Sequence, residues 1–315
     1  MKYHTPVLLQ EIVSFLNPKP GDFIIDATAG GGGHTFELLK RGAKVLAIDR
    51  DPEAIEYLKN QCQLSISQSE TSLVNCQIGQ NLFLVQGNFA NVGQIANDHR
   101  FNDVSGILFD LGISSHQIEK AERGFSYASE GPLDMRMDPG LSVKAYDIVN
   151  NFDKRRLYEI FKTYGQEKFS RTISEAICRA REVKPITTTK ELAQIIDEAT
   201  GDTKGKYIRP SQWGLKFASH GIGIKTRIFQ ALRIVVNSEL LNLEEGLPQT
   251  VDLLKKGGRL VIVSFHSLED GLVKRFFKKE RRLKVLTKKP VGPTFWEIEN
   301  NPRSRSAKLR AAEKL

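Results

Sequence analysis

The sequence predicts an α/β protein in which a Rossmann-like parallel sheet is interrupted by an inserted helical domain. Within the first 110 residues, short apolar runs alternate with helical patterns, which is typical of parallel βαβ units. A glycine-rich turn at residues 30–33 follows the first apolar run. A fifth run lies about 150 residues beyond the fourth, so a separate element must fill that interval.

The apolar runs define the expected strands. Their ranges are residues 23–28, 43–49, 82–86, 104–110 and 259–264. Helical patterns follow the first two strands, at residues 35–41 and at about residues 51–60, where Asp51 is the expected N-cap. Residues 62–81 are rich in Ser and Gln and show little periodicity, which predicts a mobile surface loop.

The long interval has the periodicity of amphipathic helices. Apolar residues recur on one helical face in residues 157–164 and again in residues 169–180. Thr188 and Glu191 have the spacing of a capping box. We therefore place a helical insert at residues 118–222, beside the carboxyl edge of the strands, where α/β sheets bind their ligands.

The remaining residues, 1–117 and 223–315, form the expected sheet domain, whose C-terminal part is strongly basic. The 315-residue chain has 46 Lys and Arg against 37 Asp and Glu, a formal charge of +9. Residues 274–315 hold 14 basic and 4 acidic side chains, so the rest of the chain is nearly neutral. This segment suits contacts to nucleic-acid phosphates, although a solvated helix face is the alternative. The candidate RNA-binding residues are Lys278, Lys279, Arg281, Arg282, Arg303 and Arg305, with Arg123 and Arg136 in the insert.

Several classes of protein are disfavoured by composition. The three cysteines form no CxxC pair, which favours a reducing compartment, and the six histidines lack metal-ligand spacing, so no metal is expected. No apolar run approaches the roughly 18 residues that a membrane helix needs. The N-terminus has no leader pattern, and we expect a cytoplasmic protein with no membrane partner.

A nucleotide site is predicted where the glycine turn meets the second strand. Asp49 ends that strand and lies 17 residues after Gly32, close to the spacing of a βαβ nucleotide unit. Glycines let the backbone approach a ligand, and an acid at this position accepts protons from the ribose hydroxyls. The alternative is a glycine turn that only joins a strand to a helix.

The departures from a dinucleotide pattern point to a different nucleotide. Thr35 stands where a GxGxxG motif starting at Gly30 needs its third glycine, and Asp26 would repel a pyrophosphate. A carboxylate at Asp26 suits S-adenosylmethionine, which carries an amino group and a sulfonium. Phe89, after the third strand, either packs near the adenine or belongs to the ordinary core.

Eight ordered motifs spread over nearly the whole chain resemble the bacterial ribosomal small-subunit RNA cytosine-N4 methyltransferases, the MraW/RsmH family. GPLDMRMD is close to diagnostic by itself. The motifs are DATAGGGGH (26–34), AIDRDP (47–52), FDLGISS (109–115), RGFS (123–126), GPLDMRMD (131–138), FQALRI (229–234), SFHSLED (264–270) and NPRSRS (301–306).

The resemblance implies a class I methyltransferase fold with an inserted helical domain. It also implies S-adenosylmethionine-dependent N4-methylation of the P-site cytidine of 16S rRNA within the small ribosomal subunit. The implied cofactor contacts are Gly32, Gly33, His34, Asp49, Phe89, Asp110 and Gln117. Two segments depart from the family: residues 62–81 are longer than usual, and residues 223–226 (GIKT) replace the usual His-Pro-Ala-Thr after an unfamiliar stretch from Tyr207.

Asp110 is our candidate catalytic residue. An acceptor bonded to one N4 proton of cytosine would return electron density to the nitrogen as the methyl bond forms, and Ser114 would shape the same pocket. The alternative is that Asp110 only binds the cofactor. His266 follows the fifth strand and either contacts RNA or has a structural role.

Three other functions remain to be weighed. The transfer chemistry is the same for a cytosine-N4 methyltransferase acting on DNA or on another RNA. A nicotinamide-dependent dehydrogenase shares the glycine turn and Asp49, but Thr35 and Asp26 argue against it. A non-catalytic RNA-binding assembly factor that retains the cofactor pocket is not excluded by any feature of the sequence.

Overall fold

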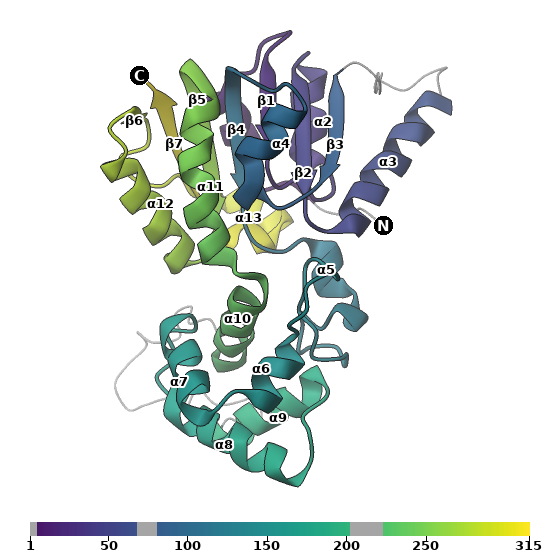
Figure 1. Cartoon of the computed structure of the whole chain (residues 1–315), viewed down its shortest axis with the longest axis vertical. Helices are drawn as coiled ribbons and strands as arrows, with labels where there is room; N and C mark the ends of the chain where they lie inside the picture. The colour runs from purple at the N-terminus through teal and green to yellow at the C-terminus, as the bar shows by residue number, and fades with distance from the viewer. Residues whose placement is uncertain (1–4, 68–80, 202–222) are drawn as a thin grey trace. The chain divides into compact units, whose positions relative to one another are not determined.

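The computed structural model describes residues 5–67, 81–201 and 223–315 (Figure 1). They form two compact units: Met1–Ser115 together with Leu240–Leu315, and His116–Glu239. The second unit continues past residue 222, where we expected the insert to end, because the helix that begins at Ile224 belongs to it. The unfamiliar stretch at residues 207–222 lies outside the described residues.

The first unit is built on a seven-stranded sheet with the order β3-β2-β1-β4-β5-β7-β6. Strands β1 to β5 are parallel, and β7 runs antiparallel to both of its neighbours. The strands are β1 (Phe23–Asp26), β2 (Lys44–Asp49), β3 (Leu82–Gln86), β4 (Val104–Asp110), β5 (Leu254–Ser264), β6 (Leu283–Val285) and β7 (Lys308–Lys314). The α/β class predicted from the sequence is confirmed.

The five predicted strands are all present, and two have the predicted bounds. The first ends at Asp26 instead of residue 28, where the chain turns toward the glycines, and β5 begins earlier than expected, at Leu254. Strands β6 and β7 were missed. The charged sequence of β7 does not read as a strand, yet four of its seven residues are buried.

Helices cover both faces of the sheet. They are α1 (Leu9–Leu16), α2 (Gly33–Lys40), α3 (Pro52–Ser67), α4 (Val92–Asp98), α11 (Glu239–Leu253) and α12 (Ser267–Lys279). The short helix α13 (Phe295–Asn300) of the same unit has no buried residue. The expected loop at residues 62–81 is wrong for its first part, because α3 continues to Ser67. The remainder of that segment, residues 68–80, lies outside the described residues.

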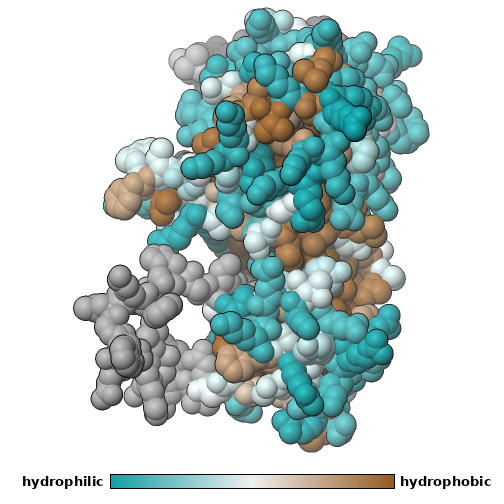
Figure 2. All heavy atoms as spheres, turned by 90° about the vertical axis from the view of Figure 1, so that its left-hand side faces the viewer, coloured by the Kyte–Doolittle hydropathy of each residue, from teal (hydrophilic) through white to brown (hydrophobic). Residues whose placement is uncertain are grey.

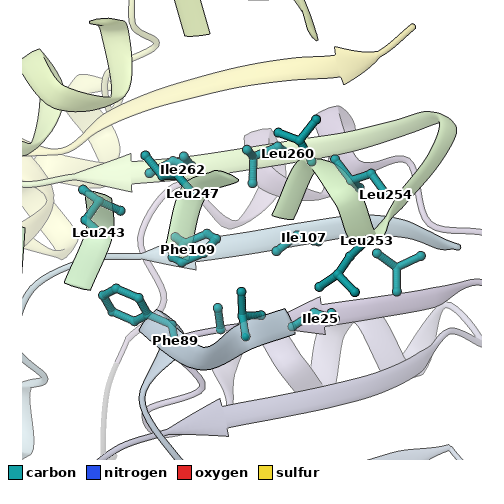
Figure 3. Close-up of a cluster of buried hydrophobic side chains, with 14 of the residues drawn as sticks. Ile25, Phe89, Ile107, Phe109, Leu243, Leu247, Leu253, Leu254, Leu260 and Ile262 are labelled. Carbon is teal, nitrogen blue, oxygen red and sulfur yellow. The ribbon is translucent and has the colours of Figure 1, made fainter. Parts of the chain in front are cut away.

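The alternation of side chains along the strands creates two hydrophobic clusters. Ile25 and Ile107 belong to one cluster, whereas their neighbours Ile24 and Leu108 belong to the other. A strand directs successive side chains to opposite faces, so the two clusters lie on opposite faces of the sheet. Figure 3 shows the first cluster, in which leucines of α11 pack over β4 and β5.

The second unit is helical, as the sequence predicts. Thr188 and Glu191 form the expected capping box, in which the Thr188 hydroxyl accepts from the Glu191 amide and the Glu191 carboxylate accepts from the Thr188 amide. Its helices are α5 (Ser115–Glu119), α6 (Ala145–Asn151), α7 (Lys154–Thr163), α8 (Ser170–Val183), α9 (Thr189–Thr200) and α10 (Ile224–Asn237).

Hydrophilic residues cover most of the molecular face in Figure 2, with smaller hydrophobic areas between them. No helix among the described residues has both the length and the apolar character needed to cross a membrane.

One basic residue of the C-terminal segment, Arg310, is not on the molecular surface. Arg310 of β7 is buried, and its Nε lies 2.7 Å from Asp270 Oδ1 of α12. Its charge therefore joins β7 to α12 instead of facing solvent.

We expect Arg310→Gln to lower the free energy of unfolding by about 2 to 4 kcal/mol, because Asp270 loses its buried partner. Lys308→Gln is the matched control. Lys308 faces the same carboxylate at 3.7 Å but is partly exposed, with 43% of its side chain accessible, so its loss should cost less than about 1 kcal/mol. Urea unfolding measures the free energy of unfolding of both variants and of the parent protein. Equal losses in the two variants would contradict the structural role of Arg310.

Candidate active site

The glycine turn between β1 and α2 forms one side of the candidate site. Gly30 and Gly32 have φ angles of +49° and +79°, a region that residues with a Cβ rarely adopt. A Cβ on Gly32 would also collide with Leu58 of α3 and with Phe36. The sequence needs glycine here for the turn itself and for the close approach of α3.

Asp49, at the end of β2, is fixed against this turn. Its Oδ2 accepts from the Gly30 amide at 2.8 Å, and its Oδ1 accepts from the Asp51 amide at 2.8 Å. Burial raises the pKa of Asp49 to about 6, against the effect of these two hydrogen bonds. A carboxylate oxygen has two acceptor sites, so both oxygens can still accept from ligand hydroxyls.

Asp26, at the end of β1, is buried beneath the same turn. Its carboxylate accepts from the Thr35 hydroxyl at 2.7 Å and from the Thr28 amide at 3.2 Å. Burial raises its pKa to about 6. Thr35 therefore supports Asp26, which gives a structural reason for the departure from the dinucleotide pattern.

Asp110, at the end of β4, is the third carboxylate of this edge. Its amide donates to the Thr28 hydroxyl at 2.6 Å, which links the ends of β4 and β1. Burial, together with the negative charges of Asp26 and Glu269, raises the pKa of Asp110 well above its usual value. Its Oδ2 lies 3.7 Å from Nδ1 of His34.

His34, in the first turn of α2, is buried and faces two acceptors. Its Nε2 lies 3.1 Å from the Val7 carbonyl, which places the ring proton on that nitrogen. Burial lowers the pKa of His34 to about 4, so the ring is neutral near pH 7. It therefore does not neutralise the carboxylates beside it.

These residues fit S-adenosylmethionine by the chemistry of their side chains. Asp26 and Asp110 are buried carboxylates whose raised pKa records an unfavourable environment for negative charge, which a bound cation would relieve. Asp49 offers acceptors to a ribose, and the glycine turn brings Gly32 and Gly33 to the same strand edge. S-adenosylmethionine combines two cationic centres with a ribose.

Phe89 is part of the hydrophobic core, which is one of the two roles that we considered for it. It begins a short 3-10 helix, η1 (Phe89–Asn91), and its ring packs edge-on against Phe109 at 5.3 Å between centroids (Figure 3). It belongs to the hydrophobic core of the first unit. A contact between Phe89 and adenine stays a prediction.

The other predicted site residues are distributed over both units. Ser114 lies between β4 and α5 at the end of the first unit, whereas Gln117 is buried in α5 of the second. The second unit also contains the buried Arg123, which donates to the Arg136 and Met137 carbonyls. None of these positions tests the role that we predict for the residue.

Arg136 is occupied within the second unit. It forms two hydrogen bonds to the Asp134 carboxylate and donates to the carbonyls of Pro139 and Leu141. The guanidinium groups of Arg123 and Arg136 thus hold the loop around residues 131–141 together. Contacts of Arg123 and Arg136 with RNA phosphates stay a prediction.

The six basic residues of the C-terminal segment that we predict to bind RNA are exposed but differ in their partners. Lys278 and Lys279 are in the last turn of α12, and Arg281 follows it. Arg282 pairs with Glu280 and Asp252, both of which raise its pKa. Arg303 and Arg305 are exposed on the 3-10 helix η3 (Pro302–Ser306).

His266 caps α12. Of the two roles that we considered for it, an RNA contact and a structural role, the structure shows the structural one. The ring is buried, its Nδ1 accepts from the Glu269 amide at 3.4 Å, and its Nε2 lies 3.1 Å from Glu269 Oε1. Glu269 itself was missed by the sequence analysis, as were Thr28 and Val7. Only their proximity in the fold connects these residues to the site.

The sheet with its one reversed strand, the glycine turn and the acid that ends β2 define a class I S-adenosylmethionine-dependent methyltransferase. The sequence model of the MraW methylase family matches residues 1–315, and the chain belongs to this family. The resemblance stated from eight motifs is thereby confirmed.

The relatives cover the chain from end to end. It is 43% identical over 320 residues to "Ribosomal RNA small subunit methyltransferase H" of Persephonella marina, covering 100% of both chains. It is 41% identical over 331 residues to the protein of that name from Carboxydothermus hydrogenoformans, covering 99% of this chain and 98% of the relative. Among solved structures, the chain is similar to an rRNA methylase from Streptococcus thermophilus, which covers 98% of both chains at 12% identity and a TM-score of 0.43.

We expect Asp49→Ala to weaken S-adenosylmethionine binding by about tenfold or more, because the ribose loses hydrogen bonds to a charged acceptor. Glu37→Ala, which removes a carboxylate on the surface of α2, is the control and should leave the affinity unchanged. Calorimetric titration measures both. An unaltered affinity in Asp49→Ala would mean that the ribose binds elsewhere.

The raised pKa values also predict how the stability of the free protein depends on pH. Asp26 and Asp49 have a pKa of about 6 in the fold and 3.8 ordinarily, so the folded state binds more protons and is stabilised as the pH falls through 6. His34 opposes this below its usual 6.5, because its pKa in the fold is about 4.

Since the carboxylates outnumber the imidazole, we expect a higher melting temperature at pH 5 than at pH 7.5 in the absence of cofactor. Asp26→Asn should reduce this difference because it removes one of the titrating groups. Scanning calorimetry at both pH values gives the result. A melting temperature that falls on acidification of the parent protein would contradict the raised pKa values.

Proposed function

We propose that this enzyme methylates N4 of a cytidine in 16S rRNA, at the P site of the small ribosomal subunit, and acts in the cytoplasm. The observation that carries the proposal is the end-to-end similarity to proteins named ribosomal RNA small subunit methyltransferase H, at about 40% identity. The carboxylates at the sheet edge supply the chemistry, and the basic C-terminal segment supplies an RNA contact.

The chemical difficulty lies in the nucleophile. The lone pair of the exocyclic amine is conjugated into the cytosine ring, so an acceptor for one N4 proton makes the nitrogen more reactive. S-adenosylmethionine, when bound, supplies an electrophilic methyl carbon. The protein must therefore hold N4 in line with that carbon and withdraw a proton as the bond forms.

The position of Asp110 and its raised pKa support its proposed role as the acceptor of the N4 proton. Class I methyltransferases meet their acceptor at the end of this strand, and the Thr28 hydroxyl fixes the Asp110 backbone there. A carboxylate with a raised pKa is a stronger base than an exposed one. Ser114, four residues further along, is proposed to shape the pocket for the base.

The cofactor contacts proposed for this function are those that the family resemblance implies. Asp49 binds the ribose, Asp26 and Asp110 offset the positive charge, and the glycine turn admits the ligand. Gln117 of the second unit is proposed as a further contact. The full proposed set is Gly32, Gly33, His34, Asp49, Phe89, Asp110 and Gln117.

The target base must leave its stack before N4 can react, which favours a single-stranded or flipped cytidine. Lys278, Lys279 and Arg281 are exposed and are proposed to position the strand through its phosphates. Arg282 already pairs with two carboxylates, so its contribution should be smaller. Arg303 and Arg305 extend the basic surface.

Mass spectrometry of small-subunit RNA from cells with and without the protein tests the proposal. We expect N4-methylcytidine at one position only when the protein is present. Isolated 16S rRNA, assembled small subunits and DNA, compared as methyl acceptors in vitro, separate this function from a DNA or other RNA methyltransferase. The absence of methylation with every acceptor would instead indicate a non-catalytic assembly factor.

Asp110→Asn should lower turnover by roughly 10² or more, because the amide cannot accept the N4 proton as a base. The affinity for S-adenosylmethionine should fall far less than the turnover, because Asp26 and Asp49 still bind the cofactor. Single-turnover methylation and calorimetric titration separate the two effects. A loss of affinity that accounts for the whole loss of activity would assign Asp110 to cofactor binding, and unchanged turnover would remove it from catalysis.

A further inference from the structure

Two adjacent aromatic residues are exposed at the start of α13. Phe295 is 78% exposed and Trp296 72%, the highest values among the phenylalanine and tryptophan side chains that the structure describes. The helix that carries them is well formed, because the Thr294 hydroxyl caps it by accepting from the Glu297 amide at 3.2 Å. Exposure of one apolar residue is ordinary, but two neighbouring rings on an ordered helix indicate a contact surface.

Helix α13 is attached to the segment that lies on the glycine turn. Glu297 Oε1 accepts from the Leu8 amide at 2.7 Å, and Leu8 has a φ of +53°. The Asn301 side chain donates to the Thr5 carbonyl at 3.4 Å. The exposed rings therefore belong to a helix held at two points against the N-terminal segment.

The same N-terminal segment contacts the candidate cofactor site. The carbonyl of Val7 faces Nε2 of His34, and Pro6 lies so close to Gly33 that an added Cβ would meet its ring at 3.0 Å. Figure 1 shows α13 at the end of the sheet where the parallel strands finish. Helix α13, which carries the aromatic pair, thus lies at the edge of the sheet that bears the proposed methyl-transfer residues.

Exposed cations that suit a nucleic acid flank α13, which itself carries Glu297 and Glu299. Lys288 and Lys289 precede the helix, Arg303 and Arg305 follow it, and all four are exposed. Lys288, Lys289 and Arg305 form no ion pair within residues 5–67, 81–201 and 223–315. Aromatic side chains among cations are the usual means of binding single-stranded nucleic acid, because bases stack on the rings while the cations contact the phosphates.

We infer that Phe295 and Trp296 form a stacking platform for unpaired bases of the RNA strand that carries the target cytidine. The inference rests on the proposed function and assigns a binding site for its substrate. Stacking on α13 would hold the strand at the sheet edge while Lys288, Lys289 and Arg305 contact its backbone. A stacking platform is indifferent to base identity, so it contributes affinity and position while the pocket selects cytosine.

A substitution series at Trp296 tests the platform. Binding of a single-stranded RNA dodecamer of mixed sequence, measured by fluorescence anisotropy, should weaken about fivefold or more in Trp296→Ala and further in the Phe295→Ala/Trp296→Ala double variant. Trp296→Tyr should restore most of the affinity, because it keeps an aromatic face. Trp296→Leu should not, although it keeps an apolar side chain of similar exposure.

The controls separate this inference from the alternatives. Val183→Ala removes an exposed apolar residue of the second unit and should leave RNA binding unchanged. A blunt RNA duplex should bind the parent and Trp296→Ala equally, because its bases are not available for stacking. Trp296→Leu binding the dodecamer as tightly as the parent would overturn the inference and indicate an apolar protein contact instead.

Methyl transfer to small subunits, measured with the same variants, separates a failure of the stacking platform from a failure of the proposed function. If the platform exists, Trp296→Ala raises KM for the RNA substrate and leaves S-adenosylmethionine affinity unchanged. If RNA affinity and KM are unchanged in every Trp296 variant while the parent methylates cytidine, the platform is refuted and the proposed function stands. If the parent forms no N4-methylcytidine, the proposed function fails whatever the binding data show.

Discussion

The burial of carboxylates at one edge of the sheet is the constraint on which the site depends. Asp26, Asp49 and Asp110 end β1, β2 and β4, and burial raises the pKa of each. The fold keeps them there at a cost in stability, as strained and unfavourable groups at functional sites commonly do. A ligand that brings positive charge and hydroxyl donors recovers part of that cost. The burial that disfavours the ionised carboxylates in the free protein therefore strengthens the binding of a cationic cofactor.

The parallel topology explains why this edge could be predicted from the sequence. Asp26, Asp49 and Asp110 are far apart along the chain, but each follows an apolar run that reads as a strand. Parallel strands end at the same edge, so the ends of three strands identify one site. The helical insert and its capping box were predictable for a similar reason, because periodicity and caps are local signals.

Contacts made only by the tertiary fold could not be predicted. Thr35 supports Asp26 through a hydroxyl that the sequence shows only as a missing glycine. Arg310 looked like part of a basic tail, but it is buried against Asp270 in a strand that charged residues concealed. His266 proved to be a helix cap. In each case the outcome depends on a neighbour that local patterns do not reveal.

The most direct test of the electrostatic account is the number of protons released when S-adenosylmethionine binds. Calorimetric titrations at pH 6, in two buffers with different enthalpies of ionisation, give that number. At this pH the carboxyls of Asp26 and Asp49 are about half protonated, so ionisation on binding should release roughly 0.5 proton from each. A binding enthalpy that is the same in both buffers would show that no proton leaves, and would contradict the claim that the cofactor relieves buried negative charge.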